Sequence, residues 1–438
     1  MYKLLELNPQ LQPFAWDIEY RMQLYRDTKA RLMPNGGMLR DFANAHNYFG
    51  IHPVDGGWVY REWAPNAYQL YLTGDFNGWN WTEQPMLRYG DGCWGLFLPG
   101  DDALWEGCRV RTIVDANFTR TAHVPVYSHR VIREADAHSW CAEVVDDRKQ
   151  FAWTDENFAG EASLNIYEAQ VDTYREFADN TLPRIKAAGY NTLQLKGIME
   201  HSDGICQTTC FYAASSRFGN PEDLKYLVNK AHEMGVRVLM EVVHSYASGN
   251  PAAGINLFDG TEYQFFHAGE KGNHPARGAK CFDYGKPQVI HFLLSNLKFW
   301  MTEYHFDGFR FDGVTSMLYH DHGLGTDFNS NDKYFSYNTH VEAVTYLQLA
   351  NELIRQVNPK AITIAEDMSG MPGMCLPIED GGIGFNYRLG MGLPDMWVKT
   401  VKERKDEFWD IFGMWCNMSM AFTSRSTRTN KKISCFGT

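Results

Sequence analysis

The sequence predicts an α/β fold, a (β/α)8-type barrel of which about five strands are present, preceded by an all-β sandwich. Between residues 46 and 150, short alternating segments are separated by glycine-containing turns, which is typical of a sandwich. From Leu164 onward, short apolar strands alternate with amphipathic helices, which indicates βαβ units and a parallel sheet. The predicted regions are a helical segment at 1–45, the sandwich at 46–150, the partial barrel at 151–410 and an aberrant or disordered tail at 411–438.

The first region is predicted to be helical because Ile18, Met22 and Tyr25 are spaced by four and then three residues. The break at Pro34-Asn-Gly-Gly37 ends this pattern. In the sandwich that follows, the clearest strand candidates are residues 57–63 and 68–74.

Five barrel strands are predicted after the linker, and helices of three-to-four periodicity lie between them. The loops after the later strands are long enough to build a site, and active sites of such barrels lie at the carboxyl ends of the strands. The predicted strands are 164–171, 190–195, 236–243, 306–312 and 361–366, and the clearest helices are 221–234 and 288–304.

Composition excludes several functional classes. The formal net charge of −12 argues against a nucleic-acid binder, which needs a basic surface to replace the counterions of phosphates, so a neutral polar substrate fits better. No apolar run reaches 18 residues, and the first residues lack the pattern of a signal peptide, so we expect no membrane span and a cytoplasmic protein. The oligomeric state is not predicted.

The cysteines bear on disulfides and metal binding, and the tryptophans bear on sugar binding. The nine cysteines are odd in number and scattered, and Cys206 and Cys210 have no second pair to complete a zinc site, so we expect neither a disulfide framework nor a metal, and no organic cofactor. Nine of the 13 tryptophans precede residue 155. Sugar faces stack on such rings, but a single Trp is more often part of a core, so only an exposed cluster would favour sugar binding.

The densest motif runs from Phe306 to Met317 and contains Arg310 and Asp312. Alternate side chains of a strand point to one face, so Arg310 and Asp312 are predicted to point into the barrel, with Phe309 and Phe311 packed outward. The neighbouring Arg favours the ionised carboxylate, which suits a nucleophile.

The next predicted strand places Ile362, Ile364 and Glu366 on one face. Burial above two apolar layers would raise the pKa of Glu366, which suits a general acid. Each acid alone could equally cap a helix or pair with Arg, but two on adjacent strands favour catalysis. Together they form the pair that retaining glycoside chemistry needs, with Asp312 as nucleophile and Glu366 as acid and base.

The amino-acid sequence of these segments resembles that of the 1,4-α-glucan (glycogen) branching enzymes of the α-amylase superfamily. The resemblance implies a carbohydrate-binding sandwich, a (β/α)8 barrel, an α-1,4-glucan or glycogen substrate, and the same two catalytic acids. It also implies substrate contacts for Arg310, Glu241, His244, Tyr246 and Asp367. The similar passages are 61–65, 72–79, 215–219, 221–225, 256–260, 306–320 and 363–372.

Some positions depart from the family pattern. Glu241 stands where the family has Asp, Tyr246 where it has His, and Gln170 where it usually has His. The aromatic loop after the second strand is replaced by residues 202–210. A displacement of about 1 Å in a positioning group can lower the rate roughly a hundredfold. We therefore expect Glu in place of Asp at position 241 to affect the reaction rate.

The text after Asp410 no longer resembles the family. The motif with a third catalytic Asp does not occur, and three barrel strands are expected to be missing with it. An open parallel sheet exposes unpaired edges, so we expect this chain alone to fold poorly or to be inactive. The leading prediction is transfer of an α-1,4-glucan segment to a 6-hydroxyl. The alternatives are an amylase-type hydrolase and a non-catalytic glucan-binding pseudoenzyme fragment.

Overall fold

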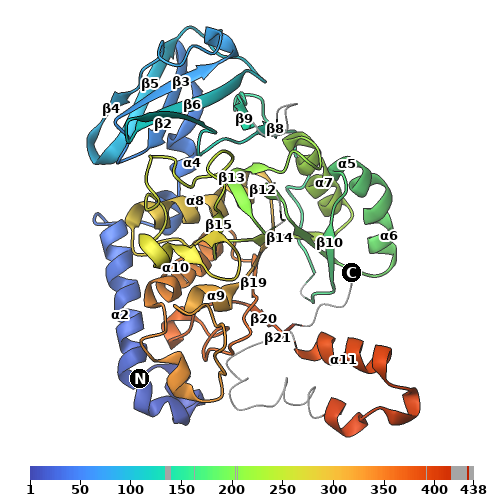
Figure 1. Ribbon diagram of the computed structural model, residues 1–438. Coiled ribbons are helices and arrows are strands. Elements are labelled where there is room, and N and C mark those ends of the chain that lie inside the picture. Colours follow the sequence, from blue (N-terminus) through green and yellow to red (C-terminus); the bar gives the residue numbers. More distant parts are fainter. Residues whose placement is uncertain are drawn as a thin grey trace.

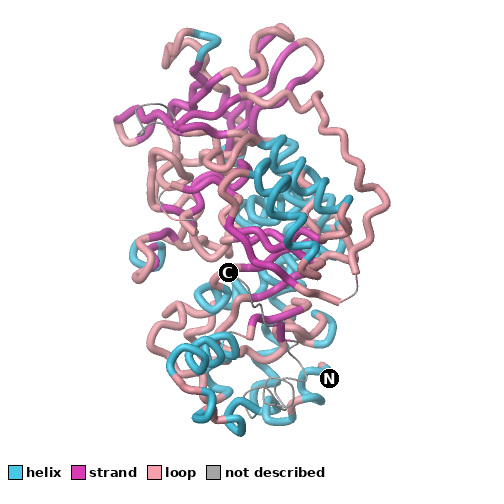
Figure 2. Tube along the Cα trace, turned by 90° about the vertical axis from the view of Figure 1, so that its right-hand side faces the viewer, coloured by secondary structure: helices cyan, strands magenta, loops and turns pink. Residues whose placement is uncertain are grey.

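The computed structural model describes residues 1–133, 140–161, 163–202, 204, 206–390, 392–415 and 432–433. Helices, a β-sandwich and a helix-flanked parallel sheet follow one another along the chain (Figure 1). In Figure 2 the sandwich strands lie at one end of the molecule and the parallel strands lie nearer its middle. Most of the predicted tail, 411–438, lies outside the described residues.

The first region is helical, as predicted, and packs against the barrel. Ile18, Met22 and Tyr25 are buried on one side of the long helix α2, which lies along α10. Lys29 Nζ lies 2.5 Å from a carboxylate oxygen of Glu352 in α10. The helices of this region are α1 (Lys3–Leu7), α2 (Ala15–Leu32), α3 (Leu39–Phe42) and α4 (Ala45–Tyr48).

The sandwich consists of two antiparallel sheets. One sheet has the order β1-β2-β5-β4, and the other has the order β3-β6-β9-β8, with β7 paired to β6. Both strand candidates from the sequence are present, as β2 and β3. The bounds are β1 (Gly50–Val54), β2 (Gly57–Trp63), β3 (Gln69–Gly74), β4 (Leu87–Arg88), β5 (Cys93–Pro99), β6 (Arg109–Ala116), β7 (Thr119–His123), β8 (Val131–Arg133) and β9 (Trp140–Glu143).

Most of the sandwich tryptophans are structural. Trp58 and Trp94 are 1% and 2% exposed, and their indole N–H groups donate to backbone carbonyls. Trp81 and Trp105 are exposed, at 43% and 47%. Tryptophan content therefore marks the core of this module more than its surface.

The barrel sheet is parallel and has the order β10-β11-β14-β18-β19-β20-β21 among the described strands. All five predicted strands are confirmed. The sequence missed β20, a three-residue strand without an alternating pattern, and β21. The bounds are β10 (Ile166–Gln170), β11 (Thr192–Lys196), β14 (Arg237–Val242), β18 (Gly308–Phe311), β19 (Ile362–Ala365), β20 (Tyr387–Leu389) and β21 (Lys432–Ile433).

The helices between these strands begin and end where the sequence indicates. In α7 the Asn220 side chain accepts a hydrogen bond from the Asp223 backbone N–H, Pro221 is the first helical residue, and Gly235 follows with a positive φ. The helices are α5 (Tyr174–Glu176), α6 (Leu182–Ala187), α7 (Pro221–Glu233), α8 (Pro287–Glu303), α9 (Val314–Leu318), α10 (Val341–Val357) and α11 (Gly392–Glu403).

The two faces of the sheet separate as the alternation predicts. Ile364 belongs to a small cluster with Leu239 on the barrel interior, whereas Phe309 and Phe311 belong to the large core shared with the helices. Glu366, two residues after Ile364, therefore follows the interior face at the carboxyl end of β19. Short strands also occur in the long loops: β12 (Met199–His201), β13 (Thr208–Ala214), β15 (Ala247–Ser248), β16 (Asn273–His274) and β17 (Ala279–Lys280).

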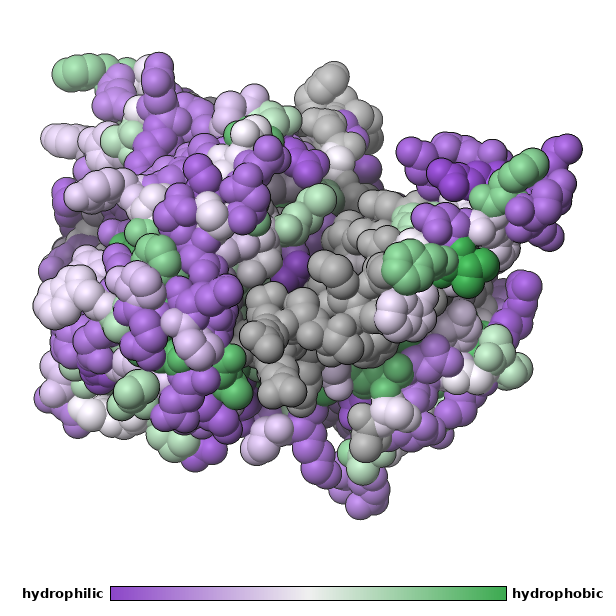
Figure 3. Space-filling view, turned by 90° about the horizontal axis from the view of Figure 1, so that it is seen from below, coloured by the Kyte–Doolittle hydropathy of each residue, from purple (hydrophilic) through white to green (hydrophobic). Residues whose placement is uncertain are grey.

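The sandwich is joined to a barrel loop by polar contacts, since Asn66 Nδ2 donates to Asp259 Oδ2 at 2.7 Å. Hydrophilic side chains predominate among the coloured residues on the face seen from below (Figure 3). Within the described ranges, no helix combines the length and apolar character needed to cross a membrane.

Candidate active site

Arg310 is the centre of a group of carboxylates at the carboxyl end of the parallel sheet. It lies directly opposite Glu241 in the register of β14 and β18, and its Nη1 contacts Glu241 Oε2. Its Nη2 lies 2.9 Å from Glu366 Oε2 and 3.5 Å from Asp312 Oδ1. One guanidinium therefore ties together acids from three consecutive strands.

Asp312 and Glu366 lie close enough to act on one atom. Because their oxygens contact the same nitrogen at 2.9 and 3.5 Å, their separation is below the roughly 6.5 Å at which inverting pairs begin. Their side chains are 14% and 19% exposed, so the pair is accessible from one side.

Backbone contacts fix both acids just beyond their strands. The backbone N–H of Asp312 donates to Val242 O, and that of Glu366 donates to Phe311 O, each at 3.0 Å. Gly313 then turns the chain with φ +64°, a conformation that favours glycine. Its N–H donates to Glu366 Oε2 at 3.2 Å.

The pKa values of the two acids are shifted in opposite directions. Burial raises the pKa of Asp312 to about 8, helped by the hydrogen bond with Glu366 and the negative charge of Glu241. Burial also opposes ionisation of Glu366, but its pKa is lowered by the hydrogen bond with Asp312 and the charge of Arg310. Asp312 is therefore the harder of the two acids to ionise, because Arg310 Nη2 lies closer to Glu366.

Glu241 forms the floor of the group. It is 2% exposed, and burial raises its pKa although Arg310 opposes the shift. Its Oε2 contacts Arg310, whereas its Oε1 is buried without a hydrogen-bond partner.

Sequence reasoning missed two members of the group. Glu168, in β10, accepts from Gln194 Nε2 at 2.8 Å and lies 3.9 Å from Arg310 Nη1. Lys196, in β11, pairs with Glu168 at 3.2 Å. Charged side chains on the first two strands were the available signal, since parallel strands end at one edge of a sheet.

His244, a predicted substrate contact, lies away from solvent. Its side chain is fully buried, with Nδ1 2.6 Å from Tyr346 Oη and Nε2 2.9 Å from Asn296 Oδ1. Burial lowers the pKa of His244 to about 4. The residue holds the strand against α8 and α10, because its position faces the helices.

Asp367, another predicted substrate contact, is also buried. This side chain is fully buried and accepts from Thr315 Oγ1, Ser369 Oγ and the backbone N–H groups of Ser369 and Gly370, at 2.6–2.9 Å. Its oxygens are occupied by the turn that follows β19, so Asp367 shapes the loop.

Tyr246 lies beside the acids without being open to solvent. It is 2% exposed, and its ring contacts that of His274 edge-on at 5.6 Å. Burial raises its pKa, and the charges of Asp312 and Cys206 add to the shift. The predicted sugar contact of Tyr246 therefore has no open face in this structure.

Comparison with known proteins agrees with this architecture. Residues 48–128 match carbohydrate-binding module 48 (Isoamylase N-terminal domain). A pullulanase from Bacillus acidopullulyticus superposes with a TM-score of 0.60 at 19% identity, over 79% of this chain and 45% of that one. A Paenibacillus barengoltzii pullulanase superposes with a TM-score of 0.57 at 18% identity, over 73% of this chain and 52% of that one. The chain therefore shares the fold of these pullulanases over most of its length.

Sequence relatives narrow this class. The chain is 43% identical to a 1,4-alpha-glucan-branching enzyme of Aspergillus oryzae, over 96% of this chain and 64% of the relative. Such enzymes of Yarrowia lipolytica and Felis catus are 44% and 41% identical, over 92% and 93% of this chain and 63% and 61% of theirs. Over more than nine tenths of its length, the chain is therefore similar to 1,4-alpha-glucan-branching enzymes. It spans less than two thirds of the length of these relatives.

Proposed function

We propose that the group around Arg310 is the donor site of a retaining 1,4-α-glucan-branching reaction. Asp312 is the nucleophile, Glu366 is the acid and base, and Arg310 positions both. The observation that carries this is the placement of two partly open carboxyls on one guanidinium nitrogen. The family relationship supports an α-1,4-glucan as substrate.

The first half-reaction begins with a proton transfer within the pair. Burial raises the pKa of Asp312, and transfer of a proton from Asp312 to Glu366 produces a nucleophile and an acid without changing the total charge. Asp312 Oδ then bonds to the anomeric carbon while the α-1,4 bond breaks, and Glu366 gives its proton to the departing 4-oxygen.

The second half-reaction reverses these roles. Glu366 takes the proton of an acceptor 6-hydroxyl, whose oxygen bonds to the anomeric carbon as the ester bond to Asp312 breaks. Arg310 stays bound to both acids and stabilises whichever one is ionised. Attack by water in place of the 6-hydroxyl would give hydrolysis from the same intermediate.

The sandwich supports the same substrate class. Its match to a carbohydrate-binding module and the exposed rings of Trp81 and Trp105 fit a glucan-binding surface. We propose that it holds α-glucan while the barrel acts on it.

The covalent step gives a direct test. An α-maltosyl fluoride with fluorine at ring carbon 5 slows the breakdown of the ester, so the wild-type chain should gain one glycosyl mass on the peptide containing Asp312. Glu366→Gln should still be labelled, because fluoride leaves without a proton. Asp312→Asn should not be labelled.

Label on another residue, or equal labelling of Asp312→Asn, would reject this assignment. Iodine staining and reducing-end release from amylose then separate the two enzymatic readings. Branching changes the stain while few reducing ends form, whereas an amylase-type hydrolase releases many.

A further inference from the structure

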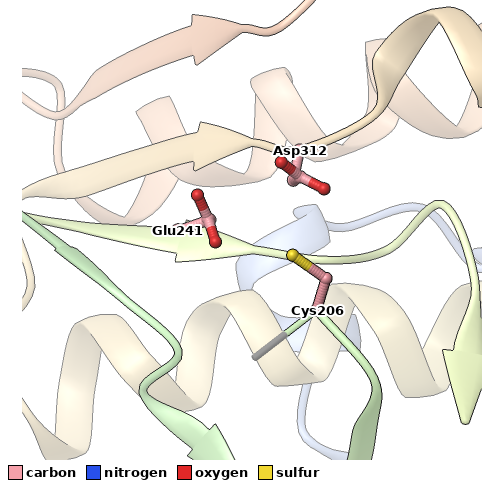
Figure 4. A group of neighbouring side chains, drawn as sticks. All are labelled: Cys206, Glu241 and Asp312. Carbon is pink, nitrogen blue, oxygen red and sulfur yellow. The ribbon is translucent and has the colours of Figure 1, made fainter. Parts of the chain in front are cut away.

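A free thiol lies beside the proposed nucleophile. Cys206 is in the loop between β12 and β13. Its Sγ and one oxygen each from Glu241 and Asp312 all lie within 4.8 Å of one another, the one such convergence of His, Cys, Asp and Glu in the described part of the chain. Figure 4 shows the three side chains gathered around one space.

The unpartnered oxygen of Glu241 indicates that this space suits a cation. Glu241 is 2% exposed, and its Oε1 has no hydrogen-bond partner although Oε2 contacts Arg310. A buried acceptor without a partner is costly, and a cation beside it would remove that cost.

The charged side chains around this space also favour a cation. The group holds four carboxylates, Glu168, Glu241, Asp312 and Glu366, against two cations, Arg310 and Lys196. Two negative charges are therefore in excess when all the acids are ionised. A divalent cation would balance them without displacing Arg310.

We propose that Cys206, Glu241 and Asp312 form a zinc site with three protein ligands and one open position. A thiolate with two carboxylates is a ligand set that Zn²⁺ accepts, and Ca²⁺ or Mg²⁺ would not select the sulfur. Tetrahedral zinc needs ligand atoms about 3.5 Å apart, so the loop bearing Cys206 has to close by about 1 Å. Cys206 releases its thiol proton when the metal binds, and so does Asp312 where it is protonated.

Zinc at this position would block the reaction. The Asp312 oxygen bound to the metal could not attack an anomeric carbon, so Zn²⁺ would act as a reversible inhibitor. This consequence rests on the proposed function, whereas metal binding itself does not. Sequence spacing gave no warning of the site, because its ligands come from three distant segments.

Cobalt provides a direct readout on the full 438-residue chain. After reduction with a phosphine and removal of metals, one equivalent of Co²⁺ should produce a near-ultraviolet thiolate-to-cobalt charge-transfer band. Cys206→Ser should lose the band and bind at least about tenfold more weakly. Cys93→Ser, a matched change at a thiol in the sandwich, should keep both the charge-transfer band and the wild-type affinity for Co²⁺.

A second measurement uses the unaltered chain, so a folding defect of the variant cannot obscure the result. One equivalent of Zn²⁺ should slow iodoacetamide alkylation of Cys206 about tenfold or more, as followed by peptide mass spectrometry, and leave Cys93 unaffected. No band in wild type, an equal band in Cys206→Ser, or unprotected Cys206 would overturn the proposal. Neither readout uses glucan, so failure of the maltosyl-fluoride labelling leaves the metal result standing.

Discussion

The two ends of the parallel sheet each carry a cluster of buried charges, and the clusters differ in how well they are satisfied. At the amino end, His232 donates to Asp155 at 2.7 Å and to Asp307 at 2.9 Å, and the backbone N–H of Val238 donates to Asp307. At the carboxyl end, Arg310 serves more carboxylates than it can match, and both Arg310 Nε and Glu241 Oε1 lack partners.

One end of a strand therefore contributes to stability, while the other end of the same strand carries reactive groups. Asp307 and Asp312 flank the same strand, β18, yet one has its partners complete and the other is held as an acid with a raised pKa. In barrels the amino-terminal face contributes stability and the carboxyl-terminal face carries the chemistry. A hydrogen-bond network in which every group has a partner makes the structure rigid. A network with unpartnered groups can still bind a substrate or an ion.

The largest effect is expected for Arg310→Leu. This change leaves buried acids without their cation, so the free energy of unfolding should fall by about 3–5 kcal/mol in urea denaturation. The rate of maltosyl-fluoride labelling should fall by roughly 10²–10³-fold in the folded fraction. Arg310→Lys keeps the positive charge but lacks the two-pronged guanidinium. Its stability and labelling rate should lie between those of Arg310→Leu and wild type. Unchanged stability would mean that the acids satisfy one another.

Asp307→Ala should destabilise without affecting chemistry. It removes the partner of His232 and of Val238 N–H, at a cost of about 3 kcal/mol in the free energy of unfolding. The folded protein should still label Asp312 at the wild-type rate. A loss of labelling as large as that of Arg310→Leu would contradict the division between the two ends.

His232→Gln tests the charge of the amino-end cluster. Burial lowers the pKa of His232, but the hydrogen bonds and charges of Asp307 and Asp155 raise it above the ordinary value. Its stabilisation is therefore complete below about pH 6.5 and is lost as the pH rises through the folded-state pKa. The stability difference between wild type and variant should shrink by about 1 kcal/mol across that range. A constant difference in urea melts at pH 6, 7 and 8 would show that His232 is neutral throughout.

The smallest effect is expected for Lys196→Met. The Lys196–Glu168 pair is about a quarter exposed on both sides, so it should contribute less than about 1 kcal/mol. A thermal unfolding midpoint close to wild type is expected. A loss comparable to that of Asp307→Ala would place Lys196 within the buried network.

Much of this division could be predicted from the sequence. The alternation of Phe309, Arg310 and Phe311 gave the inward face of β18, and Ile362 and Ile364 did the same for β19. The burial of His244 and Asp367 could not be predicted, because a resemblance transfers residue types without their surroundings. In the structure, helices α8 and α10 cover His244, and the turn after β19 saturates Asp367.

The sequence by itself determined the order of strands and helices, the inward face of each strand and the residues at its end, because these follow from periodicity and turn chemistry within short segments. Only the tertiary structure decided how close each acid lies to Arg310 and where Cys206 lies. Those properties depend on distances of a few ångströms between segments far apart in the chain, and on how much water reaches them.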